Sequence, residues 1–331
     1  MISKEAYVWV WLPETTEPVV AGKLEIDNDC IQFNYDQSYL ERINHAPRSA
    51  PNVSLEELLE SARRVEEGVL LTPELDQALF HGTAIGGARP KALIEAQDKK
   101  YVAKFSSNTA SFNVIKSEFI AMRLAALAGL SVAPVKLEKV SRKDVLLIER
   151  FDRVKTSAGW HRKMMVSALT LFELDEMMAR YGSYETLAEI IRHRFINPSD
   201  TLKELFSRLV FNILCGNTDD HARNHAAFWD GHNLSLTPAY DICPQGRAGN
   251  EASQAMLISG NTNLSQIRHC IDAAHHFLLS KEDALEIFEK QKAVIETNWL
   301  SVCDEAELTE VDKQLLWGRQ FLNSFSLEGL G

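Results

Sequence analysis

The sequence lacks any hydrophobic run long enough to cross a membrane. A transmembrane helix requires about 18 consecutive apolar residues, whereas the apolar burst within the first 12 residues is followed at once by acidic residues and prolines. This beginning also lacks the longer apolar core and the small-residue cleavage site of a secretory signal peptide. We therefore expect a cytoplasmic protein that has no membrane partner.

Paired cysteines are absent as well. The five cysteines are far apart, odd in number and form no Cys-x-x-Cys pair; they are Cys30, Cys215, Cys243, Cys270 and Cys303. This spacing does not suggest a disulfide framework. It favours reduced thiols in a reducing compartment.

Basic residues are outnumbered by acidic ones. Lys and Arg total 35 and Asp and Glu total 46, so the net charge is −11. This balance argues against a surface that coats nucleic acid as a whole, because phosphate neutralisation requires clustered cations, but it permits a local basic groove. Residues 1–75 hold six basic and fourteen acidic side chains and therefore most of the excess charge. Since we also find no helix-turn-helix pattern, any contact with DNA is expected to require a partner.

The length of 331 residues is enough for two domains or for one large bilobed domain. The first 75 residues are rich in β-strand formers, and three strands are predicted there: Tyr7–Leu12, Val19–Ile26 and Cys30–Tyr35. A helix is predicted to follow, because Ser54 and Glu57 form a capping box and Gly68 suits its end. We therefore interpret residues 1–75 as a small β-rich subdomain.

A second β-rich block occupies residues 76–155. Strands are predicted at Lys91–Ala96 and Tyr101–Phe105, on either side of a polar turn at residues 97–100. A helix near 114–128 is predicted to end at Gly129. Two short strands then flank residues 141–144, the second of them Val145–Arg150.

Residues 156–331 are predicted to be mostly helical, from about residue 161 onward. The clearest helix runs from about 202 to 215, with apolar residues at i, i+3, i+4 and i+7 and with Thr201 and Glu204 as a capping box. A hairpin, Ala226–Trp229 and Leu234–Leu236, interrupts the helical pattern, which returns at about 264–325.

The densest polar cluster, residues 217–225, lies between that helix and that hairpin. Asp219 and Asn224 are five residues apart, and a second acid, Asp241, follows the hairpin. Phosphotransferases of the kinase type use this arrangement: the first Asp accepts the proton of the substrate hydroxyl, and the Asn and the second Asp hold Mg²⁺. The pattern therefore predicts Asp219 as a catalytic base and Asn224 and Asp241 as metal ligands.

A nucleotide site is predicted upstream of this cluster. Residues 82–91 form a glycine-rich loop, where Gly86 and Gly87 let backbone amides approach phosphates. Lys104 ends the next strand between apolar neighbours, and Glu118 near the start of the following helix is positioned to pair with it. Residues 145–151 would form a hinge whose backbone faces adenine.

Each signal alone has a simpler interpretation. An isolated Asp-Asn-Asp set is usually turn chemistry, a Gly-Gly pair is usually a turn, and a lone lysine at a strand end is usually on the surface. Their ordered co-occurrence favours the functional interpretation. His221 and His225 are four residues apart, but the Glu of a zinc-binding HExxH motif is missing.

The segments GGARPKA, YVAKF, SEF, LLIERFDR, NTDDHARNH and AYDICP, in this order between residues 80 and 245, resemble the HipA-like serine/threonine kinases of bacterial toxin–antitoxin modules. The resemblance implies an α+β, bilobed, protein-kinase-like fold. It consists of the N-terminal subdomain (1–75), a kinase N-lobe (76–155) and a helical C-lobe (156–331). ATP and Mg²⁺ are the implied cofactors.

The resemblance also implies roles for individual residues. Asp219 matches the catalytic base, His221 an invariant-type position of the same motif, and Asn224 and Asp241 the Mg²⁺ ligands. The implied nucleotide-binding residues are Gly86, Gly87, Ala88, Lys91, Lys104, Glu118, Glu149 and Phe151.

Two positions depart from the family pattern. Relatives often carry a serine in the glycine-rich loop whose autophosphorylation silences the kinase, and Ala84 aligns with it here. Either the neighbouring Thr83 is the autophosphorylation site or the switch is absent. Some relatives have Gly after the catalytic Asp, where this chain has Asp220, an extra carboxylate expected either to bind metal or to repel phosphate.

The resemblance therefore predicts an ATP- and Mg²⁺-dependent protein kinase that acts as a toxin on a cytoplasmic protein, with aminoacyl-tRNA synthetases as an implied target class. A helix-turn-helix antitoxin is the implied partner, through which operator DNA is contacted indirectly. Two alternatives stay open. One is a catalytically weak protein that acts by binding an antitoxin–DNA complex. The other is a small-molecule kinase of the aminoglycoside phosphotransferase type.

Overall fold

The computed structural model describes residues 5–12, 15–27, 30–40, 91–96, 98–105, 113–140, 143–247 and 249–330. The helix predicted between Ser54 and Gly68, and the glycine-rich loop with Thr83, Gly86, Gly87 and Ala88, lie outside these residues. Within the described ranges, no helix combines the length and the apolar character that crossing a bilayer requires.

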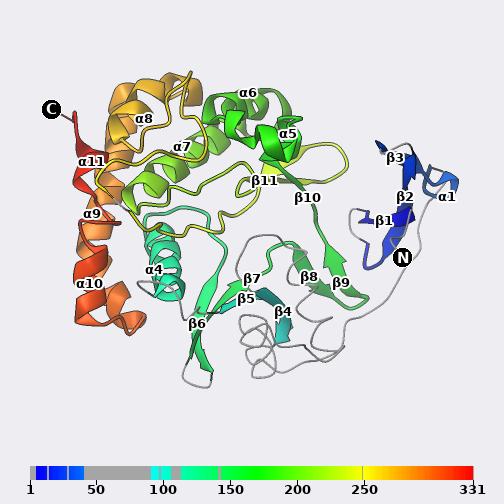
Figure 1. Cartoon of the computed structure of the whole chain (residues 1–331), viewed down its shortest axis with the longest axis horizontal. Coiled ribbons are helices and arrows are strands. Elements are labelled where there is room, and N and C mark those ends of the chain that lie inside the picture. The colour runs from blue at the N-terminus through cyan, green and yellow to red at the C-terminus, as the bar shows by residue number, and fades with distance from the viewer. Residues whose placement is uncertain are drawn as a thin grey trace.

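The three predicted N-terminal strands are present and form one antiparallel sheet. They are β1 (Glu5–Trp11), β2 (Pro18–Asp27) and β3 (Cys30–Tyr35), with β2 in the centre, and the short helix α1 (Gln37–Leu40) follows. Figure 1 shows this sheet apart from the helices, beside the hairpin of β8 and β9. Trp11 contributes to the contact between them, since the centre of its ring lies 3.3 Å from the guanidinium carbon of Arg162.

A four-stranded antiparallel sheet follows, in the order β4-β5-β7-β6. Its strands are β4 (Lys91–Ala96), β5 (Lys99–Phe105), β6 (Val135–Val140) and β7 (Lys143–Glu149). Strand β5 begins two residues earlier than predicted, because Asp98 adopts a left-handed conformation (φ 60°) and tightens the turn. The register pairs Lys104 of β5 with Lys91 of β4 and Leu146 of β7.

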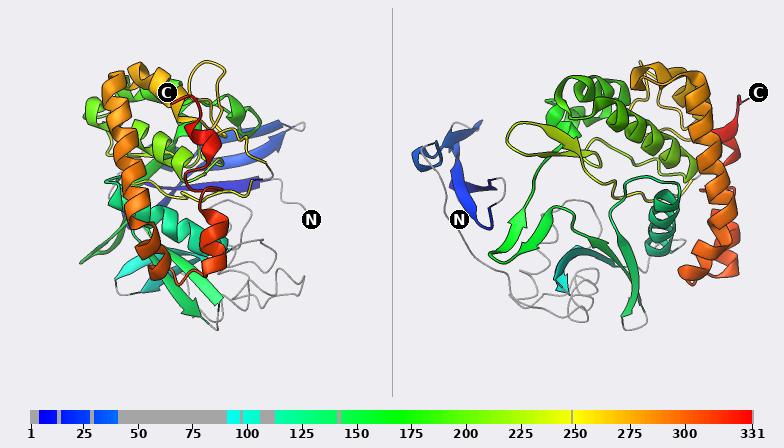
Figure 2. Two further views of the ribbon diagram at one scale, coloured as in Figure 1. Left: turned by 90° about the vertical axis from the view of Figure 1, so that its left-hand side faces the viewer. Right: turned by 180° about the vertical axis from the view of Figure 1, so that it is seen from behind.

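Helix α4 (Val114–Leu127) packs between this sheet and the helical part of the chain, as both views in Figure 2 show. Asn113 caps its start by accepting a hydrogen bond from the Lys116 amide, and Gly129 follows its end with φ +91°. The predicted helix is therefore confirmed with its end at the predicted glycine. Most of its residues are buried, because it contacts β6 and β7 on one side and α9 on the other.

The prediction of helix from about residue 161 is wrong for the first residues of that segment. The chain forms the hairpin β8 (Arg153–Thr156) and β9 (Gly159–Arg162), and then β10 (Met164–Ser167). Strand β10 pairs with β11 (Ala226–Trp229), which pairs with β12 (Leu234–Leu236) as predicted. A strand of four residues is too short to show the alternation of apolar and polar residues that predicts a strand. Strand β10 is formed by pairing with β11, which lies some 60 residues further along the chain.

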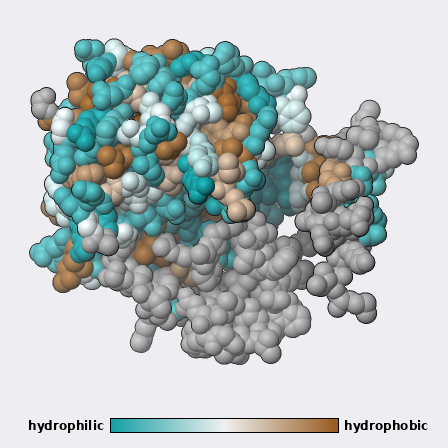
Figure 3. Space-filling view, turned by 45° about the horizontal axis from the view of Figure 1, so that its top comes forward, coloured by the Kyte–Doolittle hydropathy of each residue, from teal (hydrophilic) through white to brown (hydrophobic). Residues whose placement is uncertain are grey.

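The remaining regular elements are helices, as expected. The helices are α5 (Ala168–Leu171), η1 (Glu176–Tyr181), α6 (Tyr184–Arg194), α7 (Pro198–Leu214), α8 (Ile267–Ala273), η2 (Ala274–Phe277), α9 (Lys281–Glu305), α10 (Glu310–Leu316) and α11 (Ser324–Leu327). Figure 1 shows α7 enclosed by α4, α6, α8 and α9. One buried apolar cluster includes residues of all five helices. Figure 3 shows that hydrophilic residues cover much of the visible outer face.

Helix α7 is longer at its start than its apolar pattern predicts. It begins at Pro198, which suits the first turn of a helix because its missing amide has no partner there anyway. The predicted capping box is wrong: the Thr201 hydroxyl donates to the Asn197 carbonyl at 2.9 Å, and Glu204 accepts from Arg208 Nε at 2.8 Å. Among the described residues, the thiols of Cys215, Cys270 and Cys303 are buried and form no disulfide, in agreement with the expectation from sequence.

Gly216 ends α7 and leads into the polar cluster predicted from sequence. Its φ is +73°, and a Cβ atom there would lie 2.6 Å from the backbone oxygen of Gln320. The residue therefore needs glycine twice, for its backbone conformation and for the close approach of another segment.

We predict that Gly216→Ala lowers the free energy of unfolding by about 2–4 kcal/mol, because the left-handed penalty and the clash add. Gly318→Ala is the matched control, since Gly318 has φ +71° and open space around its Cβ position. It should cost only about 1 kcal/mol. Denaturant titration of both variants measures the difference, and equal losses would contradict the clash.

Candidate active site

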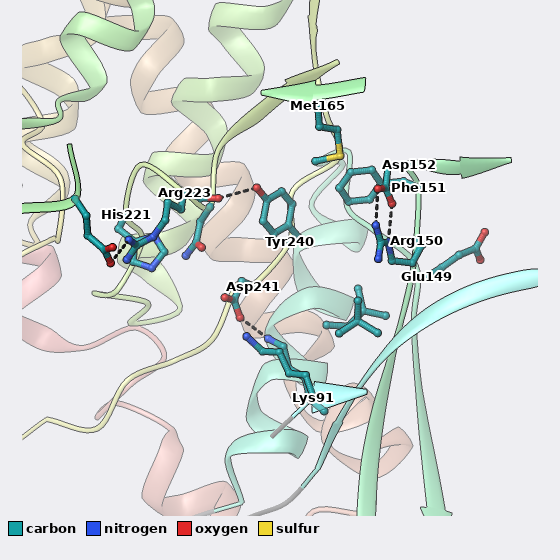
Figure 4. Close-up of a pocket in the computed structure, with 15 residues that line it drawn as sticks. Lys91, Glu149, Arg150, Phe151, Asp152, Met165, His221, Arg223, Tyr240 and Asp241 are labelled. Carbon is teal, nitrogen blue, oxygen red and sulfur yellow. Dashed lines mark hydrogen bonds and ion pairs between the residues drawn. The ribbon is translucent and has the colours of Figure 1, made fainter. Parts of the chain in front are cut away.

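A cleft of about 670 Å³ separates the four-stranded sheet from the helical part of the chain. It is lined by Lys91, Val102, Lys104, Ile148, Glu149, Arg150, Phe151, Asp152, Met165, Glu176, His221, Arg223, Asn224, Tyr240 and Asp241. Seven of these were predicted as site residues: Lys91, Lys104, Glu149, Phe151, His221, Asn224 and Asp241. Figure 4 shows Lys91 and Asp241 at one end of the cleft and Phe151 and Asp152 toward the other.

An ion triad of Lys104, Glu118 and Asp241 lies at the inner end of the cleft, with Lys104 and Glu118 buried and Asp241 partly exposed. Lys104 Nζ is 2.5 Å from Glu118 Oε1, as predicted, and it also donates to Asp241 Oδ1. Lys104 is 6% exposed and Glu118 is fully buried. Burial alone would lower the pKa of Lys104, but the two carboxylates outweigh it and raise that pKa above its usual value. Lys104 therefore stays charged at neutral pH.

Asp241 follows β12 and faces the sheet from the other side of the cleft. Burial would raise the pKa of its carboxyl group, but the charge of Lys104 outweighs burial and lowers it. Its φ of 59° is rare for a residue with a side chain, and such strain is often found at functional sites. Asp241 is therefore an ionised carboxylate that is held toward Lys104.

Aromatic and aliphatic side chains form the outer part of the cleft. The rings of Phe151 and Tyr240 are 5.7 Å apart, and the Tyr240 hydroxyl donates to the Arg223 carbonyl at 2.7 Å. Val102 and Ile148 complete this wall from the sheet. An apolar wall of this kind suits a flat aromatic ligand.

The predicted hinge is only partly available to a ligand. The amide of Glu149 donates to the Pro134 carbonyl at 2.9 Å, and the amide of Arg150 donates to the Lys100 carbonyl at 2.7 Å. The Glu149 carboxylate pairs with Lys99 at 2.5 Å and points away from Asp241 in Figure 4. The amides of Glu149 and Arg150 and the Glu149 carboxylate therefore bond within the sheet region. Phe151, another residue of the predicted hinge, lines the cleft.

Sequence reasoning missed a charged cluster at the rim. Asp152 accepts two hydrogen bonds from Arg150, at 2.7 and 2.6 Å, and a third from Arg153. Burial opposes ionisation of Asp152, but the arginines outweigh it and its pKa is lowered. Burial, together with repulsion among the arginines, lowers the pKa of Arg153 and of Arg162 to about 10. The Arg-Phe-Asp-Arg run was the available signal, because alternating opposite charges beside a strand end indicate a pairing.

The loop after α7 presents its two adjacent acids to opposite sides. Asp219 is exposed, whereas Asp220 is 3% exposed. Asp220 Oδ2 accepts from Asn212 Nδ2 at 2.8 Å, from His225 Nε2 at 3.0 Å and from the Tyr184 hydroxyl. The expectation that this extra carboxylate binds metal or repels phosphate is therefore wrong, because the core encloses it.

The other residues of the loop divide in the same way. Asn224 and His221 line the cleft, and Asn224 Nδ2 donates to the Asp219 carbonyl at 3.2 Å. His225 belongs to the buried group around Asp220. Within the described residues, Nδ1 of His221 is buried without a hydrogen-bond partner. Asp219 itself is not among the lining residues of the cleft; it lies on the exposed side of the loop.

Two residues that line the cleft offer oxygen ligands that suit Mg²⁺. This ion prefers oxygen ligands and usually takes only one or two of them from protein carboxylates, with phosphates and water supplying the rest. Asp241 offers a carboxylate and Asn224 an amide oxygen, and both line the same cleft. The donor set therefore fits a metal that arrives with a phosphorylated ligand.

A small sheet lobe, a helical lobe and a Lys-Glu-Asp triad at the cleft between them define a protein-kinase-like fold. Residues 83–299 match the family model described as HipA-like C-terminal domain. Since the match covers more than half of the sequence, the chain belongs to this HipA-like kinase family.

Individual relatives are distant. The serine/threonine-protein kinase toxin HipA of Shewanella oneidensis is 26% identical over 185 residues, which is 48% of this chain and 42% of the relative. The chain spans about half the length of the curated relatives it matches.

Two solved structures share the fold. One is a complex of HipA and HipB of Shewanella oneidensis MR-1 with operator DNA. It matches with a TM-score of 0.62 at 19% identity over 81% of this chain and 72% of that chain. The other, the proinflammatory kinase CtkA of Helicobacter pylori, has a TM-score of 0.53 at 17% identity over 73% of this chain and 91% of that chain.

We predict that Lys104→Met lowers the free energy of unfolding at pH 7 by about 3 kcal/mol, because it removes the ammonium group that compensates the buried Glu118 carboxylate. In the variant, the folded-state pKa of Glu118 rises above its unfolded value. Protonation then favours the folded state, so the deficit should shrink as the pH falls toward 4.

Lys139→Met serves as the control, since Lys139 forms an exposed ion pair with Glu307. Exposed pairs contribute little, so this variant should resemble the wild type at both pH values. Denaturant titration at pH 7 and pH 4 tests the difference. A Lys104→Met deficit that stayed constant with pH would contradict the buried pair of Lys104 and Glu118.

Proposed function

We propose that the protein is an ATP- and Mg²⁺-dependent kinase that phosphorylates a serine or threonine of a cytoplasmic protein. The observation that carries this proposal is the geometry of Lys104, which is held by Glu118 and faces Asp241 across a cleft that Asn224 also lines. Kinases use this set to hold the phosphates and the metal of ATP. Membership of the HipA-like family supports the same class of reaction.

Each residue has a proposed task. Lys104 binds a phosphate oxygen, and Asn224 and Asp241 would hold Mg²⁺, which when bound neutralises the charge on the transferred phosphoryl group. Asp219 orients the substrate hydroxyl and accepts its proton, and His221, two residues further along the loop, lines the cleft. An exposed position for Asp219 suits this task, because a protein substrate has to reach it from solvent.

The nucleotide-binding assignments extend this scheme. Phe151 and its aromatic neighbours would contact adenine, Lys91 lies on the strand opposite Lys104, and Glu149 supports the hinge through Lys99. Gly86, Gly87 and Ala88 are proposed to cover the phosphates through their backbone amides. Thr83 is proposed as the autophosphorylation site, because Ala84 occupies the position of the serine that relatives modify.

We further propose a role as the toxin of a toxin–antitoxin pair. A structural neighbour is described as a HipA–HipB toxin–antitoxin system with its operator DNA. By analogy, this chain would bind a helix-turn-helix antitoxin and reach DNA only through it. The proposed substrate is a cytoplasmic protein, with an aminoacyl-tRNA synthetase as the first to test.

We predict that Asp219→Ala and Asp241→Ala each lower phosphate transfer from radiolabelled ATP to lysate proteins by about 10²–10⁴-fold, because one removes the base and the other a metal ligand. Asp219→Ala should keep its affinity for ATP. Asp272→Ala, which changes an exposed acid on α8, is the matched control and should keep the wild-type rate.

Two outcomes would count against this account. Transfer that survives both substitutions would overturn the residue roles. Labelling of small hydroxyl compounds, but of no lysate protein, would overturn the protein substrate and favour a small-molecule kinase.

A further inference from the structure

We infer that Asn212 and Asp220 form a buried positioning pair that fixes the two halves of the candidate active site relative to each other. The inference rests on the proposed kinase reaction for its effect on rate, but the pair itself is a property of the fold. One half is the loop of residues 217–225, with Asp219 and Asn224. The other is the segment that carries Asp241.

Asn212 lies in the last turn of α7, among Phe211, Ile213 and Leu214, and is 3% exposed. A buried amide is costly unless its hydrogen bonds are made. Both ends of this one are used: Nδ2 donates to Asp220 Oδ2 at 2.8 Å, and Oδ1 accepts from Asn217 Nδ2 at 3.0 Å. An apolar residue at this position would pack equally well within the helix. The amide is therefore explained by its hydrogen bonds to the loop of residues 217–225.

Asp220 receives the first of these bonds and ties the loop to two further elements. Its Oδ2 also accepts from Tyr184, the first residue of α6, and from His225 at the end of the loop. The rings of Tyr184 and His225 meet edge to face, 5.3 Å apart. The stretch between Asp220 and His225, which includes Asn224, is therefore anchored at both ends, and Asp219 is held on the opposite, exposed side.

Asn217 carries the second connection. Its backbone N–H donates to the backbone carbonyl of Asn212 at 2.8 Å. Its side-chain Nδ2, which also donates to Asn212 Oδ1, lies 3.5 Å from the backbone carbonyl oxygen of Asp241. A short path of polar contacts thus runs from Asp220 through Asn212 and Asn217 to the backbone of Asp241. The side-chain amide of Asn212 therefore helps to position the segments that carry the proposed base, Asp219, and the proposed metal ligands, Asn224 and Asp241.

Neither member of the pair lines the cleft, so neither touches a bound nucleotide. Both act through the residues that they hold, which makes them positioning residues rather than catalytic ones. Their loss should affect the rate of transfer more than the binding of ATP, because Val102, Ile148 and Lys104 belong to the four-stranded sheet. A misplacement of about 1 Å can reduce a rate by about 100-fold.

The test uses the full chain with Asn212→Leu, Asp220→Asn and the double variant. Each single variant should lower kcat by about 10–100-fold and change KM for ATP by less than about threefold. The double variant should lose much less than the product of the two single losses, because both remove the same contact. Hydrogen–deuterium exchange of the peptide that spans 217–225 should become faster in all three.

Gln291→Met is the matched control. Gln291 is equally buried and donates one hydrogen bond, to the Ser207 carbonyl at 2.9 Å, on the side of α7 that faces α9. It should lower the melting temperature without changing kcat or exchange in the loop. If Asn212→Leu does not fold, Tyr184→Phe removes a single donor to Asp220 and should give a smaller change in the same direction.

The pair would be overturned if the variants behaved as Gln291→Met does, with lower stability but unchanged kcat and loop exchange, or if the single losses simply multiplied. If the wild type transfers no phosphate at all, the proposed function fails, but faster exchange in the variants would still support the pair. Unchanged exchange in that case would overturn it as well.

Discussion

The structure depends on one buried ammonium group. Lys104 comes from a strand, Glu118 from the next helix and Asp241 from a segment 137 residues after Lys104, and the three meet at the inner end of the cleft. A buried lysine stays charged only where carboxylates compensate for the lost water. The sheet lobe and the helical lobe must therefore keep the separation at which Asp241 reaches Lys104.

A second buried charge organises the helical side of the cleft. Asp220 is stabilised by the Asn212 amide, the Tyr184 hydroxyl and the His225 imidazole. Burial opposes its ionisation, but His225 and the hydrogen bonds outweigh burial and lower its pKa. The two networks therefore have different roles. The network around Lys104 connects the two lobes, and the network around Asp220 holds the loop of residues 217–225.

Much of the fold follows from local patterns in the sequence. Strand alternation and a turn signal predicted β4 and β5, the apolar period predicted α7, and the order of Lys104 and Glu118 predicted their ion pair. The errors have tertiary causes. Strand β10 is too short to show a pattern without its partner β11, and α7 starts early because Pro198 suits a first turn. Asn212 was missed because a single polar residue within an apolar helix gives no sign of what it contacts.

The candidate site was predictable to a similar degree. Seven predicted residues line one cleft, because the motif order of a kinase reflects the order in which its elements reach the cleft. The opposite directions of Asp219 and Asp220 could not be predicted, since adjacent acids look alike until the partners of each are known. Met165 and Tyr240 were missed as lining residues because they come from β10 and from a loop, which are far apart in the sequence.

The most direct test of the central claim, that this cleft binds a nucleotide together with a metal, is a calorimetric titration with a non-hydrolysable ATP analogue. The account predicts one site whose affinity rises when Mg²⁺ is added. It also predicts that Asp241→Asn abolishes this rise while metal-free binding persists. Affinity that is the same with and without Mg²⁺, or a Mg²⁺ effect that survives Asp241→Asn, would contradict it.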